Sequence, residues 1–157
     1  MGRKRVRGRA GRLLRRVAAA LVACSVGFTL HAAETDEPLE PEVAFPLQAK
    51  VVPDSNGRVA RVELRFAIHA GYYLYANRFR VQAAGLAFGP LVVPAGVVKN
   101  DPFVGPSQIF RNAAVVQAPL AAQPASGEYS LAVTAQGCAE NRVCYAPFTL
   151  QVRIVVP

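Results

Sequence analysis

The stretch RVELRFAI, residues 61–68, decides the fold class of this chain. Apolar residues stand at every second position, and charged residues fill most of the positions between them. Side chains of a β-strand point alternately to the two faces of a sheet, so this period of two predicts a strand with one buried face. The segment FTLQVRIVV, residues 148–156, repeats the pattern at the carboxyl end. Strands with one buried face are therefore expected at both ends of the domain.

Residues that favour turns interrupt the chain at short intervals between these two strands. They cluster at residues 53–57, 69–71, 89–90, 94–96, 105–106 and 126–127. Further runs with strand character lie at residues 91–93, 113–116 and 129–133. Many short strands separated by turns predict an all-β domain at residues 43–157, an immunoglobulin-like antiparallel β-sandwich, with a small barrel as the alternative.

The basic residues are concentrated at the start of the chain. The 157 residues carry a formal net charge of +8, and eight of the 18 Lys and Arg residues lie within the first sixteen positions. The remaining ten basic residues are balanced by ten acidic ones. The excess charge therefore belongs to a leader and gives no indication of nucleic-acid binding.

This basic start is followed by an apolar run at residues 17–30, which has the form of a secretory signal peptide. The run is shorter than the roughly 20 residues of a membrane-spanning helix, so we predict a signal peptide at residues 1–33 and export of the chain. The stretch LVAC alternatively resembles a bacterial lipobox, in which Cys24 would be lipidated. A retained membrane anchor is a third alternative. The acidic, proline-containing residues 34–42 are predicted to be a linker without a helix.

Two cysteines follow the leader, Cys138 and Cys144. In an oxidising compartment such a pair is expected to form a disulfide, and the spacing suits facing arms of a tight β-hairpin. The spacing alone leaves open whether the bond is a structural staple or a redox centre. A metal site is not predicted, because zinc needs four ligands and His69 is the single histidine after the leader. Hydrolase chemistry has no support, since no nucleophile elbow is present.

Two other segments contain residues that could take part in chemistry. Alternation would place Tyr73 and Tyr75 on one face of a strand, where half-buried packing is the ordinary interpretation. A polar, turn-rich segment at residues 99–107 contains Asp101 and Phe103. Taken alone, Phe103 would anchor a loop to the core and Asp101 would be a solvated carboxylate.

Taken together, these segments resemble one family, the periplasmic amino-terminal domain of the thiol:disulfide interchange protein DsbD. The resemblance rests on GYYLY (71–75), DPFVGPSQIFR (101–111), QGC (136–138) and CYAP (144–147), in the family's order and approximate spacing. It covers residues 43–157. It implies an immunoglobulin-like domain whose two cysteines relay reducing equivalents in the periplasm, a protein-disulfide reductase activity without organic cofactor or metal. The implied partners are thioredoxin-fold proteins, namely disulfide isomerases and proteins of cytochrome c maturation.

The resemblance also implies roles for individual residues. Cys144 would form the mixed disulfide with a partner, and Cys138 would resolve it. Phe103 matches the aromatic residue of a cap loop that shields the sulfur atoms, and Asp101 matches an acidic residue of that loop. Pro102 departs from the family, which often has a second carboxylate there.

Tyr73 and Tyr75 match tyrosines beside the family's active site. The resemblance covers one domain of the family's proteins, and it leaves open whether a separate membrane protein conducts electrons to this domain. The first alternative is an immunoglobulin-like binding module with a purely structural disulfide. The second is a non-redox assembly or chaperone role at the membrane, for which lipidation at Cys24 would be suggestive.

Overall fold

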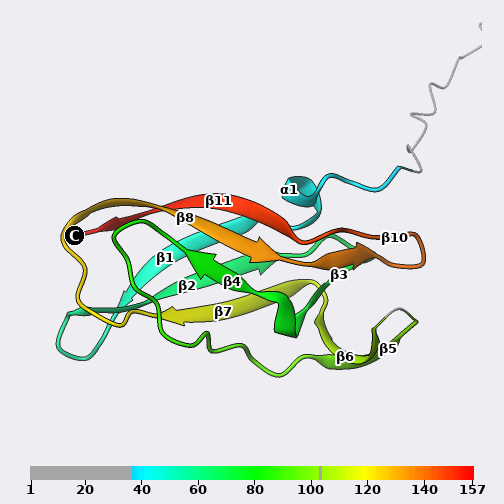
Figure 1. Cartoon of the computed structure of the whole chain (residues 1–157), viewed down its shortest axis with the longest axis horizontal. Helices are drawn as coiled ribbons and strands as arrows, with labels where there is room; N and C mark the ends of the chain where they lie inside the picture. The colour runs from blue at the N-terminus through cyan, green and yellow to red at the C-terminus, as the bar shows by residue number, and fades with distance from the viewer. Residues whose placement is uncertain (1–36, 103) are drawn as a thin grey trace, which may run out of the picture. The chain divides into compact units, whose positions relative to one another are not determined.

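The structure, a computed structural model, describes residues 37–102 and 104–157 of the chain (Figure 1). The predicted signal peptide, the lipobox cysteine Cys24 and the cap residue Phe103 lie outside these residues. Among the described residues, no helix has the length and apolar character that crossing a membrane requires.

The described residues form eleven strands and two short helical segments. In chain order these are α1 (Pro41–Ala44), β1 (Leu47–Pro53), β2 (Val59–Ala67), β3 (Tyr72–Tyr75), the 3-10 turn η1 (Ala76–Arg78), β4 (Arg80–Gln82), β5 (Val97–Asp101), β6 (Gly105–Phe110), β7 (Ala113–Pro119), β8 (Gly127–Ala135), β9 (Gly137–Ala139), β10 (Val143–Cys144) and β11 (Phe148–Val156).

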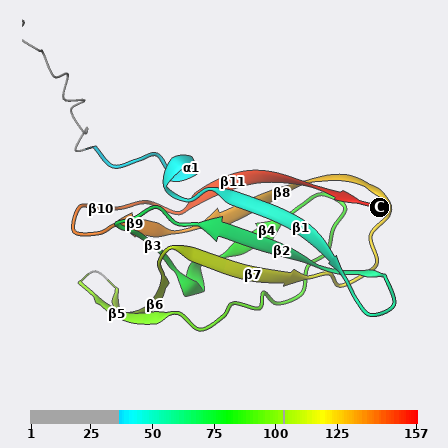
Figure 2. The same cartoon turned by 180° about the vertical axis from the view of Figure 1, so that it is seen from behind.

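The strands pair into three antiparallel sheets with the orders β1-β2-β7, β11-β8-β4 and β10-β9-β3-β6-β5. The first two sheets form the body of a sandwich (Figures 1 and 2). The third gathers β3, the β5–β6 hairpin and β9–β10 at the end of the domain away from the carboxyl terminus, as both views show. The predicted all-β antiparallel sandwich is confirmed, and the described strands form open sheets rather than a closed barrel.

Strand β2 shows why the alternating pattern was informative. Val62, Leu64 and Phe66 are completely buried between the sheets, while the charged residues between them face outward. Each buried valine or leucine contributes about 1.5–3 kcal/mol to the hydrophobic stabilisation of the fold. Strand β2 lies between β1 and β7, so its backbone groups are paired on both sides.

Two local expectations were wrong. Residues 91–93 form no strand, and only Val92 makes an isolated bridge to Gln117. Pro90 and Pro94 flank this segment and have no N–H group to donate to a ladder. The acidic linker was expected to be without a helix, yet α1 makes one turn at its end with a proline in the first turn, where a missing N–H costs nothing.

Strand β3 departs from the alternating pattern, because all four of its residues are buried. Tyr72 and Leu74 belong to the main core between the sheets. Tyr73 and Tyr75 belong to a second, smaller cluster with Ile109 and Cys138. The outer face of β3 is thus covered, and this cover contains the candidate site.

Candidate functional site

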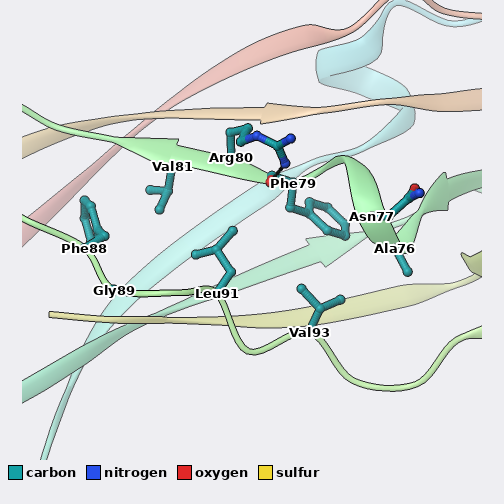
Figure 3. A pocket seen from close by; sticks show the side chains of 9 residues that line it. All are labelled: Ala76, Asn77, Phe79, Arg80, Val81, Phe88, Gly89, Leu91 and Val93. Atoms are coloured by element: carbon teal, nitrogen blue, oxygen red, sulfur yellow. Dashed lines mark hydrogen bonds between the residues drawn. The ribbon is translucent and has the colours of Figure 1, made fainter.

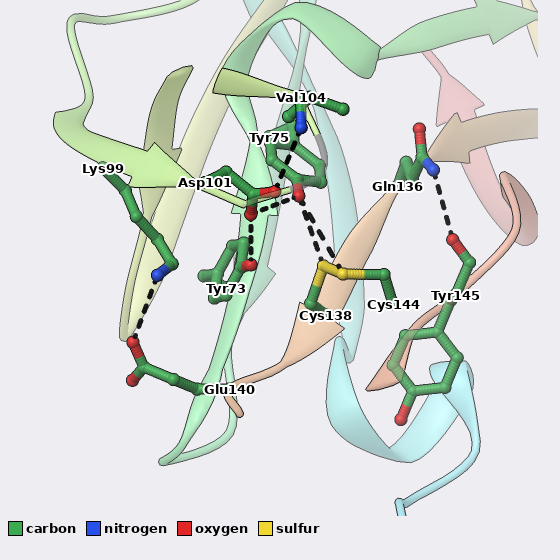
Figure 4. Close-up of a disulfide and its surroundings, with 10 residues drawn as sticks. All are labelled: Tyr73, Tyr75, Lys99, Asp101, Val104, Gln136, Cys138, Glu140, Cys144 and Tyr145. Carbon is green, nitrogen blue, oxygen red and sulfur yellow. Dashed lines mark hydrogen bonds and ion pairs between the residues drawn. A yellow bond between two sulfur atoms is a disulfide. The ribbon is translucent and has the colours of Figure 1, made fainter. Parts of the chain in front are cut away.

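The two cysteines face each other on a short hairpin (Figure 4). In the antiparallel pairing of β9 and β10, Cys144 lies directly opposite Cys138, and their sulfur atoms are bonded. The Cα atoms are 4.0 Å apart. Asn141, in the turn between the strands, has a positive φ of 60°, a conformation that asparagine tolerates better than most residues. The predicted disulfide in a tight hairpin is therefore present.

The two sulfur-bearing residues differ in access. Cys138 is 1% exposed, whereas Cys144 is half-buried and lines a cavity of about 280 Å³. The other lining residues are Tyr73, Lys99, Pro102, Ala139, Asn141, Arg142 and Val143. A reagent from solvent therefore reaches Cys144 more easily than Cys138.

Tyr73, Tyr75 and Asp101 meet beside the disulfide. Both tyrosine hydroxyls donate hydrogen bonds to Oδ2 of Asp101, at 2.8 Å from Tyr73 and 2.7 Å from Tyr75. The backbone N–H of Val104 donates to Oδ1 at 3.3 Å. Asp101 is only 4% exposed, so the expectation of a solvated carboxylate was wrong. A buried carboxylate needs such donors, because its desolvation is otherwise costly.

Tyr75 connects this carboxylate to the sulfur atoms. Its hydroxyl oxygen lies 3.4 Å from Sγ of Cys138 and 4.0 Å from Sγ of Cys144. A phenol has one proton, and here that proton is donated to Asp101. The oxygen of Tyr75 can then accept from a cysteine S–H after reduction, which favours the neutral thiol over the thiolate.

Burial and the neighbouring carboxylate also keep both tyrosines neutral. Burial raises the pKa of Tyr73 well above its usual value, and the hydrogen bond to Asp101 raises it further. The pKa of Tyr75 is raised for the same two reasons, burial first. Both phenols are therefore hydrogen-bond donors throughout the neutral pH range.

Gly137 allows the cysteine hairpin to approach β3. A Cβ atom at this position would lie 2.2 Å from the backbone oxygen of Tyr73, a distance that real Cβ atoms do not show. In the register of this sheet, Tyr73 is opposite Cys138 and Leu74 is opposite Gly137. The glycine before Cys138 therefore sets how closely the disulfide packs against the tyrosines.

An ion cluster beside the hairpin was not predicted. Nη1 and Nη2 of Arg111 each donate a hydrogen bond to the carboxylate of Glu140, with Nη1 at 2.7 Å, and Lys99 Nζ lies 3.8 Å from the same carboxylate. The hydrogen bonds from Arg111, more than any other cause, lower the pKa of Glu140. Glu140 lies between the two cysteines in the sequence, and this position is the signal that could have identified it.

Tyr145, directly after Cys144, anchors the hairpin on its other side. Its hydroxyl donates to the backbone oxygen of Leu39 at 2.6 Å, and its N–H donates to Gly137 at 3.0 Å. Gln136 donates to the backbone oxygen of Tyr145 at 3.2 Å (Figure 4). These contacts hold both ends of the hairpin, although sequence reasoning assigned them no role.

A larger cavity of about 400 Å³ lies elsewhere, between β4 and the segment that precedes β5 (Figure 3). Its lining residues are Ala76, Asn77, Phe79, Arg80, Val81, Phe88, Gly89, Leu91 and Val93. This lining contains neither a thiol nor a carboxylate. Across the described residues, His, Cys, Asp and Glu side chains form no cluster of three or more that could hold a metal ion.

Comparison with known proteins gives concordant matches. The model of the amino-terminal region of the thiol:disulfide interchange protein DsbD matches residues 35–155. DsbD of Ralstonia nicotianae is 37% identical over 137 residues, which cover 85% of this chain and 21% of that protein. DsbD 1 of Pseudomonas aeruginosa is 40% identical over 90 residues, 56% of this chain and 15% of that protein. The chain thus spans about a fifth of the length of these relatives.

Two solved structures from Neisseria meningitidis are similar to the domain. The DsbD amino-terminal domain in its reduced form has 33% sequence identity and a TM-score of 0.63, covering 75% of this chain and 90% of that chain. A complex between the DsbD and PilB amino-terminal domains matches with 32% identity and a TM-score of 0.58, covering 74% and 86%.

Proposed function

The chain belongs to the family of DsbD amino-terminal domains, and from this premise we propose that Cys138 and Cys144 exchange electrons with thioredoxin-fold proteins in the periplasm. The unequal access of the two cysteines carries the proposal, because thiol exchange needs one sulfur that a partner can reach and a second that resolves the intermediate. Cys144 opens onto a cavity and Cys138 is buried behind it. The Neisseria complex with a PilB domain supports a protein as the partner.

The proposed reaction transfers two electrons. The thiolate of Cys144 attacks a partner disulfide, forms a mixed disulfide and releases one partner thiolate. The thiolate of Cys138 then attacks Sγ of Cys144, which closes the intramolecular disulfide and releases the second partner thiolate. The two protons lost by the cysteines balance those gained by the partner's thiols. A thioredoxin-like donor returns the chain to its dithiol form by the reverse steps.

Asp101 and Tyr75 restrain the reactivity of the dithiol in this proposal. The negative charge of Asp101 disfavours a nearby thiolate, and Tyr75, whose proton goes to Asp101, can only accept a hydrogen bond from a cysteine, so both favour the neutral thiol. A less ionised thiol reacts more slowly with adventitious disulfides. Contact with a partner would remove this restraint.

Phe103 is proposed to shield the sulfur atoms, a role implied by the family. The substitution Phe103→Ala should speed reduction of the disulfide by dithiothreitol, because a small reagent would gain access to Cys144. The rate is followed by quenching with acid and separating the oxidised and reduced forms. An unchanged rate would contradict the shielding role.

Trapping variants test the exchange itself. In a Cys24→Ser background, Cys138→Ser leaves Cys144 as the single cysteine, and Cys144→Ser leaves Cys138. We expect Cys138→Ser to accumulate a mixed disulfide with an oxidised thioredoxin-fold protein, detected by non-reducing electrophoresis and mass spectrometry. The matched variant Cys144→Ser should accumulate far less, because its remaining sulfur is buried.

A redox titration separates this proposal from the binding module. An exchanging pair should have a potential in the oxidoreductase range, roughly −120 to −270 mV. A potential below about −300 mV, together with no trapped partner, would favour a structural disulfide.

A further inference from the structure

Glu140 ties the cysteine hairpin to two other segments of the domain. It lies in the cysteine loop, residues 139–143, between the two sulfur-bearing residues. Its carboxylate accepts two hydrogen bonds from Arg111, which directly follows β6, and pairs with Lys99 on β5. Figure 4 shows Lys99 reaching from its strand to Glu140. The loop is thus connected by its side chain to the β5–β6 hairpin.

Lys99 and Arg111 also contact Tyr73, one of the two tyrosines that bind Asp101. Lys99 Nζ lies 5.4 Å from the ring centre of Tyr73, and the guanidinium carbon of Arg111 lies 5.6 Å from it. Cations at this distance from an aromatic face are attracted to it. Arg111 and Lys99 are therefore each held by two groups, the Glu140 carboxylate and the Tyr73 ring. Bidentate pairing by Arg111 makes this a well-defined contact rather than a loose surface pair.

Backbone hydrogen bonds also hold the loop, and the contacts of Tyr145 and Gln136 hold the ends of the hairpin. Strand β10 has two residues and lies at the edge of its sheet. The backbone of Glu140 donates to Gly71 at 2.8 Å, and Arg142 donates to Ala139 at 3.1 Å. The carboxylate of Glu140 adds a restraint that reaches outside β3 and β9.

We propose that Glu140 is a positioning residue that favours closure of the Cys138–Cys144 disulfide. Held by Arg111 and Lys99, it keeps the cysteine loop in place in the dithiol form, so that Cys144 stays opposite Cys138. A restrained loop raises the effective concentration of one thiol at the other, which shifts the equilibrium toward the disulfide. The inference rests on the proposed function, since it concerns the same reversible bond.

Equilibrium with glutathione measures this effect. In the reaction, the two protein thiols give two electrons and two protons to glutathione disulfide, which yields the protein disulfide and two glutathione thiols. In the full chain with Cys24→Ser, Glu140→Gln should lower the equilibrium constant for closure about three- to tenfold, the size expected for one partly buried bidentate ion pair. A tenfold change corresponds to about 30 mV for a two-electron couple.

Glu63→Gln is the matched control. Glu63 on β2 also pairs with two cations, Lys50 at 3.2 Å and Arg65 at 3.3 Å, but it lies in a sheet without a cysteine. Its substitution should leave the constant unchanged. A general loss of stability would act on both redox forms alike and would not move the constant, so the readout separates positioning from folding.

Arg111→Gln provides a second variant that removes the same contact from the other side. It should lower the constant in the same direction, and the double variant with Glu140→Gln should fall no further than the larger single change. A constant for Glu140→Gln equal to that of the parent would overturn this inference alone. A parent disulfide that reaches no equilibrium with glutathione at any ratio would overturn the proposed function as well, so the two failures are distinguishable.

Discussion

Both faces of β3 carry tyrosines, but the tyrosines of the two faces have different hydrogen-bond partners. On the core face, the hydroxyl of Tyr72 accepts a hydrogen bond from the backbone N–H of Leu39 at 2.9 Å, and its ring packs edge-on against Phe45. On the opposite face, the disulfide face, the hydroxyls of Tyr73 and Tyr75 both donate to one buried carboxylate. The core face therefore binds the neutral backbone of the segment before α1, and the disulfide face places a carboxylate and two phenols beside the cysteine sulfur atoms.

This difference shows how the outer face of a sandwich strand can be buried beside a disulfide. In a two-layer sandwich the outer face of a strand ordinarily contacts water and carries polar residues. Here β6 and β9, which pair with β3 on either side, supply Ile109 and Cys138 to this face, and β5 supplies Asp101. The covered outer face excludes water, which strengthens the electrostatic effect of Asp101 on any thiolate.

Removal of bulk from the core face should have the largest effect on stability. Leu74 is completely buried in the main core, and Leu74→Ala should lower the free energy of unfolding by about 2–5 kcal/mol, because it leaves a cavity. Urea denaturation followed by circular dichroism measures the loss. The glutathione equilibrium of the folded protein should stay unchanged.

Ile109→Ala is the corresponding change on the disulfide face, where Ile109 packs with Tyr73, Tyr75 and Cys138. It should also lower stability by about 2–5 kcal/mol, but it should speed reduction of the disulfide by dithiothreitol as well. Equal effects of the two variants on the reduction rate would mean that the faces are not functionally distinct.

Alkaline pH should lower the free energy of unfolding through Tyr73 on the disulfide face, by less than the two core substitutions do. The pKa of Tyr73 is raised in the folded protein, by burial first and then by Asp101, so its contribution to stability is complete below about pH 10. Above that pH the unfolded chain loses the proton first, and stability falls by up to about 1.4 kcal/mol per pH unit for this group. Tyr73→Phe should make the decline in unfolding free energy between pH 10 and 12 less steep.

Tyr145 also contributes to the loss of unfolding free energy at alkaline pH, equally in the parent chain and in the variant. Burial, followed by the nearby Tyr72, raises the pKa of Tyr145 to about 12. It contributes a similar decline in the parent chain and in Tyr73→Phe, so the difference between them isolates Tyr73. Identical slopes in the two proteins would contradict the raised pKa of Tyr73.

The core face was largely predictable from sequence, because alternation is a local signal. The alternating residues of β2 and β11 identify two strands, and Leu64 and Ile154 are indeed buried. Alternation also placed Tyr73 and Tyr75 correctly on one face. It did not show that this face is covered, since the cover comes from β5, β6 and β9, which lie more than twenty positions later in the sequence.

The disulfide face was only partly predictable, because its interactions join distant residues. Asp101 looks like an ordinary loop carboxylate until β5 is paired with β6 and its side chain meets two tyrosines 26 and 28 positions earlier. Arg111 and Glu140 are 29 positions apart, so no local pattern connects them. Resemblance to a family identified Asp101 but not the ion cluster.

Deleting single hydroxyls compares the two faces directly. Tyr72→Phe removes a hydrogen bond to a neutral backbone group and should cost about 1 kcal/mol of unfolding free energy, whereas Tyr75→Phe removes one to a carboxylate and should cost about 1.5–3 kcal/mol. Urea denaturation at pH 7 measures both. In an Asp101→Asn background the cost of Tyr75→Phe should shrink toward that of Tyr72→Phe. Equal costs in the parent chain would indicate that Asp101 is neutral in the folded protein.

The smallest expected effect concerns the thiols themselves. Asp101→Asn removes a negative charge beside the sulfur atoms, which should favour the thiolate of Cys144 in the reduced chain. The thiolate fraction then rises, but a less basic thiolate is a weaker nucleophile, which reduces the gain in rate to roughly a few-fold. The rate of alkylation by iodoacetamide, followed by mass spectrometry on the peptide that contains Cys144, measures this change across pH.

Asp54→Asn is the control for that substitution, because Asp54 binds backbone N–H groups of its own turn far from the disulfide in the fold. It should leave the alkylation profile unchanged. If Asp101→Asn gave the same midpoint pH as the parent chain, the carboxylate would not act on the thiols. Asp101 would then have only a structural role, as the backbone N–H of Leu39 has beside Tyr72. The two faces of β3 would differ in composition but not in function.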